Sequence, residues 1–250
     1  MRVPFARLCL VVLLLAPLSG GPALADDEPN YQALRNRMVS LVEVQIILSS
    51  AETGIDELDP RISKAMRSVP RHAFVPEELR PFAYSDGPLP IGHEQNIASP
   101  YLVALMTQLA VLEPDDVVYE TGTGAGYHAA ILAELVSRVF TVEVVEPLAK
   151  EVAATFEQLE FDNVRAKPGD GYYGWASAGP FDAIIVKEAV DHVPTPLLDQ
   201  LRPGGRMVLP LGPAELGQTL TVVEKDLDGR VRRTGIMPVV FSPLQGGERT

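Results

Sequence analysis

The feature that most constrains the fold is a glycine-rich turn, Glu120-Thr-Gly-Thr-Gly-Ala-Gly126, placed between two regular elements. It follows an apolar run at residues 117–119 that is typical of a buried strand, and a helical pattern begins directly after it at Tyr127. Gly122 and Gly124 can adopt backbone conformations that other residues disfavour, so the turn can approach a ligand closely. A strand, a glycine turn and a helix in this order predict a nucleotide-binding unit.

Beyond residue 100, short apolar runs alternate with helical patterns. Strands are predicted at residues 117–120, 139–143, 164–166, 181–186 and 207–211, and helices at residues 100–112, 127–135, 147–159 and 196–201. This alternation predicts an α/β fold in which a parallel sheet is covered by helices on both faces. Two more strands, at residues 219–225 and 230–240, are expected to pair antiparallel around the turn Leu227-Asp228-Gly229.

The first hundred residues have a different pattern. Residues 30–50 predict a helix with a broad apolar face, residues 51–60 a polar loop, and Asp59-Pro60 the start of a second helix. Residues 69–92 are rich in proline and aromatic residues. They predict neither a regular helix nor a central strand, although their apolar content implies that they pack against the rest of the chain.

Two acidic positions follow the next strands after the glycine turn. Glu143 ends the second predicted strand, where a carboxylate can accept hydrogen bonds from both hydroxyls of a ribose. Asp170, in Gly169-Asp170-Gly171, follows the third strand and could accept a hydrogen bond from an adenine amino group. The carboxyl ends of adjacent parallel strands meet at one edge of a sheet, which is where open α/β sheets bind ligands.

The type of nucleotide is narrowed by two observations. The sequence contains no G-x-x-x-x-G-K-[ST] phosphate loop, which argues against an NTPase. A dinucleotide-binding fold remains open, but Glu120, directly before the glycine turn, suits a ligand that carries no phosphate.

Four stretches of the chain are similar to the protein-L-isoaspartate O-methyltransferase family. They are Arg67-Ser-Val-Pro-Arg-His-Ala-Phe-Val-Pro76, Ala83-Tyr-Ser-Asp-Gly-Pro-Leu-Pro-Ile-Gly92, Glu120-Thr-Gly-Thr-Gly-Ala-Gly-Tyr127 and Leu201-Arg-Pro-Gly-Gly-Arg-Met-Val-Leu-Pro-Leu-Gly212. The first two are specific to this family, whereas the last two are shared more widely among methyltransferases. The similarity covers roughly residues 31–244.

The resemblance implies a Rossmann-like methyltransferase fold that binds S-adenosylmethionine (SAM). This fold has a mostly parallel seven-stranded sheet with a C-terminal antiparallel strand pair, preceded by an N-terminal helical segment. Residues 26–100 would form the helical, substrate-side segment, and residues 101–250 the SAM-binding domain. The cofactor-binding residues would be Glu120, Gly122, Thr123, Gly124, Gly126, Glu143, Asp170 and Gly171.

The resemblance also implies the reaction. The family transfers the SAM methyl group to the α-carboxyl of an L-isoaspartyl residue in a damaged polypeptide, and the ester then cyclises to a succinimide that reopens partly to normal aspartate. The partners would therefore be isoaspartyl-containing polypeptides, and we expect the enzyme to be a monomer. The predicted catalytic and substrate-side residues are Asp86, Asn96, Ala98 and Ser99.

The chain departs from the family pattern at two places in this region. The family usually reads Gln-Thr-Ile-Ser-x-Pro after the second stretch, but here the sequence is Gln95-Asn-Ile-Ala-Ser-Pro100, so Ala98 replaces the serine. In addition, Lys187-Glu-Ala-Val-Asp-His192 replaces a stretch that is usually small and uncharged. These departures keep two alternatives open: a SAM-binding protein with lost or altered turnover, and a methyltransferase with a different acceptor.

Charge and side-chain chemistry exclude several other classes. A net charge of −12 argues against broad binding to nucleic acid or to an anionic membrane, because both require a basic surface. The four histidines lack the spacing of a metal site. We expect Asp191 and His192 to lie in an exposed loop rather than to form an acid–base pair.

Residues 1–25 have the pattern of a secretory signal. Arg2 and Arg7 precede an apolar run at residues 8–18, and Ala23-Leu24-Ala25 resembles a cleavage site. The sequence therefore predicts cleavage after Ala25 and a periplasmic or secreted protein without stable membrane insertion; an unused signal would leave it in the cytoplasm. Cys9 is the only cysteine, so the cleaved chain would contain no disulfide and no thiolate nucleophile.

Overall fold

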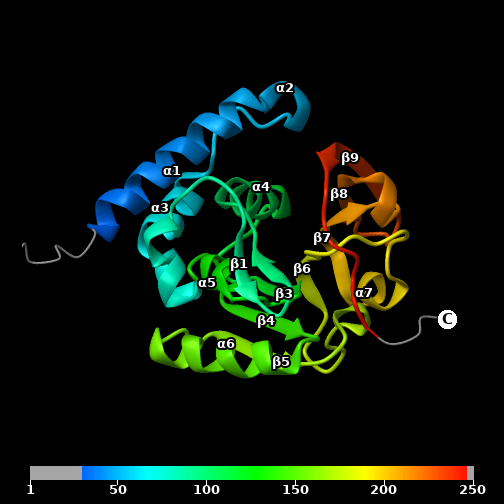
Figure 1. Ribbon diagram of the computed structural model, residues 1–250. Coiled ribbons are helices and arrows are strands. Elements are labelled where there is room, and N and C mark those ends of the chain that lie inside the picture. Colours follow the sequence, from blue (N-terminus) through cyan, green and yellow to red (C-terminus); the bar gives the residue numbers. More distant parts are fainter. Residues whose placement is uncertain (1–29, 247–250) are drawn as a thin grey trace, which may run out of the picture.

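The computed structural model describes residues 30–246, and the predicted signal segment lies outside them. Its main element is a seven-stranded sheet with the strand order β5-β4-β3-β6-β7-β8-β9. The strands are β3 (Val117–Thr121), β4 (Arg138–Glu143), β5 (Val164–Pro168), β6 (Phe181–Ile185), β7 (Leu201–Leu211), β8 (Gln218–Lys225) and β9 (Val231–Val239). β3 to β7 are mutually parallel, whereas β8 and β9 run antiparallel at one end, on the right of Figure 1. The predicted fold class is confirmed.

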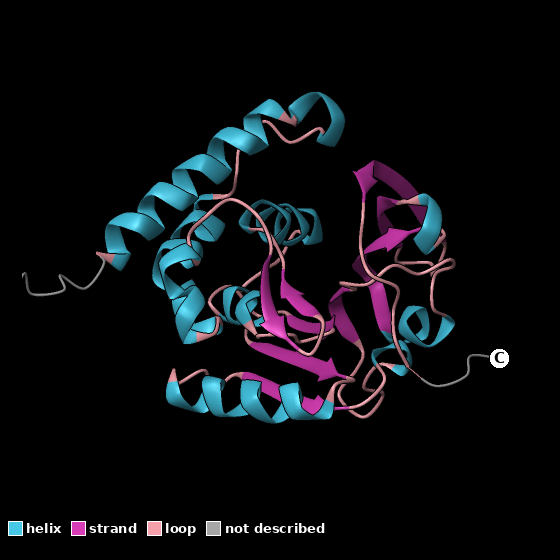
Figure 2. Cartoon of the chain, viewed as in Figure 1, coloured by secondary structure: helices cyan, strands magenta, loops and turns pink. Residues whose placement is uncertain are grey.

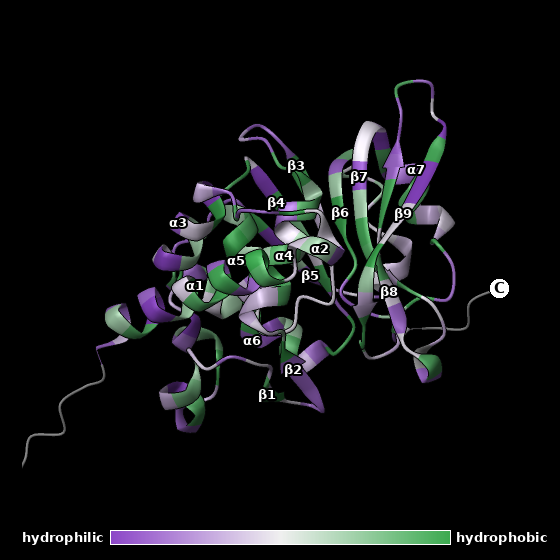
Figure 3. Cartoon of the chain, turned by 90° about the horizontal axis from the view of Figure 1, so that it is seen from above, coloured by the Kyte–Doolittle hydropathy of each residue, from purple (hydrophilic) through white to green (hydrophobic). Residues whose placement is uncertain are grey.

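Helices cover both faces of this sheet. On one face lie α4 (Pro100–Ala110), α5 (Tyr127–Ala133) and α6 (Glu146–Gln158), which share a buried apolar cluster with inward-facing strand residues. Green hydrophobic segments run through α4 and α5 in Figure 3. The other face packs against α7 (Thr195–Gln200) and the 3₁₀ turn η3 (Gly171–Tyr173). Strand residues alternate between the two clusters, as the pleat requires: Val118 belongs to the first and Tyr119 to the second.

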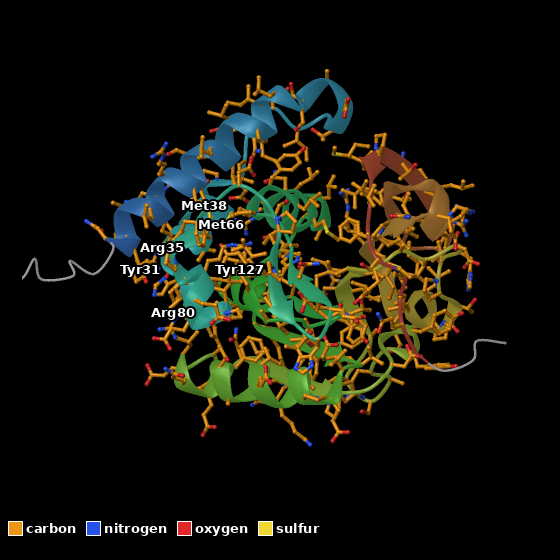
Figure 4. The ribbon with its side chains drawn as sticks, in the orientation of Figure 1. Tyr31, Arg35, Met38, Met66, Arg80 and Tyr127 are labelled. Atoms are coloured by element: carbon orange, nitrogen blue, oxygen red, sulfur yellow. The ribbon has the colours of Figure 1, made fainter. Side chains whose placement is uncertain are left out.

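The N-terminal segment packs beside the sheet on α4. It consists of α1 (Tyr31–Leu48), α2 (Ser50–Thr53), α3 (Pro60–Ser68) and the 3₁₀ turns η1 (Arg71–Phe74) and η2 (Glu77–Phe82). Asp59 begins α3, because its side chain accepts a hydrogen bond from the Arg61 N–H. Met38 of α1 and Met66 of α3, both labelled in Figure 4, are fully buried in the same cluster as α4.

Three details differ from the sequence-based expectations. The loop expected from residue 51 is helical as far as Thr53, because α2 continues almost directly from α1. Two short strands, β1 (Leu89–Gly92) and β2 (Gln95–Ile97), form an antiparallel pair near the centre of the view in Figure 2, and no strand was predicted there. A final 3₁₀ turn, η4 (Ala214–Leu216), joins β7 to β8.

Strand β7 also begins earlier than predicted. Leu201 already pairs with Phe181, and the ladder resumes where Arg206 pairs with Ala183, so residues 202–205 form a bulge. The Pro203-Gly204-Gly205 sequence hides the start of the strand from periodicity, because bulges interrupt the alternation of side chains. Among residues 30–246, no helix is long and apolar enough to cross a membrane.

Candidate functional site

A cleft of about 280 Å³ lies at the carboxyl ends of β3, β4 and β6. The floor is formed by the loops that follow these strands, at residues 122–125, 142–144 and 187–188. The facing wall is residues 94–99, from β2 to the start of α4, and residues 240–245 after β9 close one end. The cleft therefore lies where an open parallel sheet is expected to bind a ligand.

The glycine turn forms the floor of this cleft. Gly122 and Gly124 have φ angles of 55° and 56°, in the left-handed region that strongly favours glycine. Thr123 is buried, and its hydroxyl lies 2.7 Å from that of Thr141 on the neighbouring strand, which fixes the turn to the sheet. Gly126 lies outside the lining of the cleft; a Cβ there would overlap with Val152 and Phe156, so this glycine permits α5 to pack on α6.

Glu143 lies in the cleft at the end of β4. One carboxylate oxygen accepts a hydrogen bond from the Gly124 N–H at 2.8 Å, and the other accepts one from the Val145 N–H at 2.9 Å. These bonds hold the carboxylate in place, and each oxygen still has a free lone pair. The site thus presents a fixed pair of acceptors of the kind that a ribose diol requires.

The next loop contributes Gly171, whose backbone carbonyl accepts a hydrogen bond from the Tyr119 hydroxyl at 3.0 Å. Asp170 lies outside the lining. Its side chain accepts a hydrogen bond from the Tyr172 N–H at 2.9 Å, and its other carboxylate oxygen lies against Gly246. Asp170 therefore orders the loop that carries Gly171 and contacts the end of the described chain.

Glu120 is fully buried below the glycine turn and also lies outside the lining. It accepts a hydrogen bond from the Thr141 hydroxyl at 2.7 Å, and its other oxygen lies 3.0 Å from the Lys187 amine. Burial raises the pKa of Glu120, and Lys187 opposes that shift. Glu120 is thus placed to support the floor and to neutralise Lys187, not to touch a ligand.

Glu188 follows Lys187 and lines the cleft directly above Gly122. Its carboxylate accepts a hydrogen bond from the Thr121 hydroxyl, and a Cβ on Gly122 would overlap with it. Burial is the main cause that raises the pKa of Glu188 to about 7, with Glu143 and Glu120 adding to it and Thr121 and Lys187 opposing it. Three carboxylates, those of Glu94, Glu143 and Glu188, line the cleft, which disfavours a phosphate-bearing ligand and suits a cationic one.

The facing wall holds three of the four predicted catalytic and substrate-side residues. Asn96, Ala98 and Ser99 all line the cleft. Ser99 also begins α4, because its hydroxyl accepts a hydrogen bond from the Leu102 N–H at 3.3 Å. Asp86 is not in the lining; it accepts a hydrogen bond from the Gln45 amide at 2.9 Å and so connects its loop to α1.

Arg71 fixes the backbone of this wall from behind. It is completely buried, donates to the carbonyls of Ala83 at 2.9 Å and Ala98 at 2.7 Å, and lies over the Tyr127 ring. Burial lowers the pKa of Arg71 to about 10. The sequence motif Pro70-Arg71 indicated family membership. It could not indicate the hydrogen bond from Arg71 to the Ala98 carbonyl, because the two residues are 27 positions apart in the sequence.

Several lining residues were not anticipated from the sequence. They include His128, whose ring nitrogen lies 3.0 Å from the Thr107 hydroxyl, and the segment of residues 240–245. This segment is held by hydrogen bonds between Ala189 and both Ser242 and Leu244, at 2.8 and 3.0 Å. The proline and apolar residues that follow β9 were the only sequence signal for it.

Asp191 and His192 lie in an exposed loop, as predicted: their side chains are 78% and 55% exposed. Among the residues that the structure describes, no group of three or more histidine, cysteine, aspartate or glutamate side chains is arranged to hold a metal ion.

The chain is similar in sequence to known proteins. The family model for Protein-L-isoaspartate(D-aspartate) O-methyltransferase (PCMT) matches residues 44–249. The chain is 49% identical over 238 residues to Protein-L-isoaspartate O-methyltransferase 2 of Syntrophobacter fumaroxidans, which covers 95% of this chain and 96% of the relative. It is 51% identical over 217 residues to Protein-L-isoaspartate O-methyltransferase 1 of Nitrosospira multiformis, covering 87% and 89% of the two chains.

Solved structures agree with the fold. A protein-L-isoaspartate O-methyltransferase structure superposes with a TM-score of 0.72 at 26% identity, covering 85% of this chain and 66% of that chain. The structure of a putative protein-L-isoaspartate O-methyltransferase from Plasmodium falciparum, in complex with S-adenosyl-L-homocysteine (SAH), superposes with a TM-score of 0.71 at 22% identity, covering 85% and 99%.

Proposed function

The chain belongs to the protein-L-isoaspartate(D-aspartate) O-methyltransferase family, and from that premise we propose how its cleft performs the family's reaction. It is a SAM-dependent carboxyl methyltransferase that acts on L-isoaspartyl residues of damaged proteins. The observation that carries the proposal is that one cleft joins the glycine turn and Glu143 to the 94–99 wall. Cofactor and methyl acceptor can therefore meet in it.

The residues of the cleft fit SAM. Gly124 leaves room for close approach, Gly122 admits the Glu188 carboxylate, Glu143 supplies two oriented acceptors for the ribose hydroxyls, and Gly171 borders the same side of the cleft. We assign Thr123 and Gly126 to the shape of the turn, and Glu120 to its support from below. We assign Asp170 to the adenine end, where it orders the loop of Gly171.

The reaction depends on aligning SAM with the acceptor carboxyl more than on proton transfer. SAM, when bound, supplies a methyl group on a positively charged sulfur. The acceptor α-carboxyl is already ionised near neutral pH, so no general base is required. The cleft residues must therefore orient the acceptor and exclude water, and effects of this kind can account for much of the rate of a bimolecular transfer.

Asn96 is the residue we assign to the acceptor. Its amide lies on the wall that faces the glycine turn, and it can donate a hydrogen bond to a carboxylate. Ser99 stands one position further along, where the hydrogen bond it accepts holds its oxygen at the start of α4, and Ala98 has no polar side-chain atom, so the wall lacks the hydroxyl that the family pattern places at position 98. Arg71 keeps this wall in position through the Ala98 carbonyl.

The two parts of the chain have separate roles in this proposal. Residues 26–100 supply the substrate-side wall, and residues 101–250 supply the SAM-binding part and the segment after β9. Because both the 94–99 wall and the glycine turn of one chain border the same cleft, we propose that the protein acts as a monomer.

We also propose that the protein acts outside the cytoplasm, in the periplasm or the medium. The support is the sequence alone: Arg2, Arg7, the apolar run at residues 8–18 and the Ala23-Leu24-Ala25 site. N-terminal sequencing of the protein from its native cells should start near Asp26. A product that begins at Met1 and stays in the cytoplasmic fraction would refute export.

The activity is tested with purified protein, SAM labelled on the methyl group, and an isoaspartyl peptide. Base treatment hydrolyses a methyl ester, so volatile labelled methanol should appear, and a peptide of the same sequence with normal aspartate is the control. Tight SAM binding without label in either peptide would instead identify a SAM-binding protein that has lost turnover. Label in both peptides would indicate a different acceptor.

A further inference from the structure

Glu188 places a carboxylate in the cleft, against the glycine turn. It follows β6, and its side chain rests on Gly122 of the neighbouring loop, held there by the Thr121 hydroxyl. Thr121 is itself fixed, because its hydroxyl accepts a hydrogen bond from the Lys187 N–H at 3.1 Å. The position of this carboxylate is therefore set by the backbone of two adjacent strands, not by a flexible surface contact.

The position of Glu188 along the cleft determines which part of the cofactor it can contact. Along the edge of the sheet the strand order is β4, β3, β6, so Glu143, Gly122 and Glu188 follow one another. Glu143 marks the ribose end in the proposed function, and Asn96 and Ala98 mark the acceptor wall. The sulfur of the cofactor joins the adenosine to the transferable methyl group, so it must lie between these two regions, beside Gly122 and Glu188.

The charge of Glu188 is only partly offset by Lys187. Lys187 points to the buried Glu120, with its amine 3.0 Å from the carboxylate, and so already has an acidic partner. Within residues 30–246, Glu188 itself forms no ion pair; its hydrogen bond comes from a neutral hydroxyl. The raised pKa of Glu188 agrees with a poorly solvated carboxylate, which a positive charge beside it would stabilise.

We propose that Glu188 is a specificity-determining residue that makes this enzyme prefer SAM over its product SAH. The inference rests on the proposed SAM-binding role of the cleft. The two ligands share the adenosine and the amino acid end, but the sulfur is positively charged in SAM and neutral in SAH. A carboxylate beside the sulfur attracts only the first, so methyl transfer removes the attraction and the product leaves more readily.

The test compares the affinities of three ligands by calorimetry at pH 8.5, where Glu188 is ionised. The ligands are SAM, SAH and an analogue with an amino group in place of the S-methyl group, which is positively charged at the same place as SAM. The variants are Glu188→Gln and Glu188→Asp. The control is Asp191→Asn, which removes one exposed carboxylate from the same loop.

We expect Glu188→Gln to reduce the preference for SAM over SAH by about tenfold, since a charge pair in a partly buried site is worth at least that much. The charged analogue should weaken in parallel with SAM, Glu188→Asp should keep part of the preference, and Asp191→Asn should keep all of it. Steady-state inhibition by SAH should become correspondingly stronger in Glu188→Gln.

Other outcomes overturn the inference in distinguishable ways. Equal weakening of all three ligands would place Glu188 at the amino group that they share. Equal strengthening would show that its side chain only fills the cleft. A wild-type protein that binds none of the three would refute the proposed function itself, and the inference with it.

Discussion

The Glu143 carboxylate accepts a hydrogen bond from the Gly124 N–H at 2.8 Å, so the acidic residue that ends β4 fixes the glycine turn that follows the neighbouring strand β3. The acceptor for the ribose and the turn that approaches the ligand are thus one connected unit. A change in Glu143 should alter both its own contact with the ligand and the geometry of the turn.

Glu143→Gln should weaken SAM binding about tenfold. The amide nitrogen cannot accept a hydrogen bond, so one of the two N–H groups of Gly124 and Val145 loses its acceptor, and one fewer acceptor faces the ribose. Calorimetry with SAM measures the loss. Glu146→Gln, at an exposed position that forms an ion pair with Lys150, is the control and should bind normally. Unchanged affinity in Glu143→Gln would remove the ribose assignment.

Asp170→Ala should weaken SAM binding by about 1.5–3 kcal/mol, while Asp170→Asn should cost less. Asparagine keeps an oxygen that can accept from the Tyr172 N–H, so it preserves the order of the loop, whereas alanine does not. Binding of SAM to the two variants separates these effects. Equal losses of SAM affinity in both variants would show that binding depends on the charge of Asp170 and not on the order of the loop.

The sequence predicted the central strands well because β3 and β6 are mostly buried and therefore read as short apolar runs. It could not predict which buried carboxylates reach the cleft. Glu120 and Glu143 both follow apolar runs and both are buried, yet only Glu143 lines the cleft, because this depends on how the loops after each strand are arranged. Residues 240–245 escaped prediction for a related reason: their place is fixed by hydrogen bonds to Ala189, some fifty residues earlier.

Arg71→Ala should reduce the free energy of unfolding by about 3 kcal/mol, because it leaves the Ala83 and Ala98 carbonyls without their donor and opens a cavity. Arg71→Lys should recover only part of this, since an ammonium cannot span both carbonyls in the geometry of a guanidinium. Urea denaturation of the three proteins is the measurement. A loss below about 0.5 kcal/mol in Arg71→Ala would show that Arg71 does not hold the wall.

Glu188 should make stability fall as pH rises. Its pKa is about 7 in the folded chain against an ordinary value of 4.5, so its stabilising contribution is complete below pH 4.5 and is lost by the time the pH passes 7. Glu188→Gln does not titrate. Relative to wild type it should therefore gain roughly 2 kcal/mol of stability between pH 4.5 and 8, less than the full shift implies because the side chain is partly exposed.

Urea denaturation at both pH values, without ligand, measures this difference, and Asp191→Asn is the control for a loss of one carboxylate. The groups that act on Glu188, namely Lys187, Glu120, Glu143 and Thr121, are present in both proteins, so the comparison measures the Glu188 carboxyl together with its coupling to them. A constant difference between wild type and Glu188→Gln across this range would show that Glu188 is solvated and ionised like a surface residue.

Ala98→Ser should raise the kcat/KM for an isoaspartyl peptide by about tenfold. Position 98 lines the cleft, and Arg71 holds its backbone, so a hydroxyl added there would be presented to the acceptor from a fixed main chain. Ser99 presents its hydroxyl from a different place, because the hydrogen bond that it accepts from the Leu102 N–H holds its oxygen at the start of α4. Negative charge on the acceptor falls as the new bond forms, so the hydroxyl would orient the carboxylate rather than stabilise developing charge, and the gain stays modest.

The matched control is Ala98→Val, which adds bulk at the same position without a hydroxyl and should not increase the rate. SAM affinity, measured by calorimetry in each variant, should stay constant, because the substitution acts on the acceptor wall. If Ala98→Ser leaves kcat/KM unchanged in an enzyme that is already active, Asn96 alone must orient the acceptor. The substitution Asn96→Ala would then abolish most of the remaining activity, since no other side chain assigned to the acceptor could donate to its carboxylate.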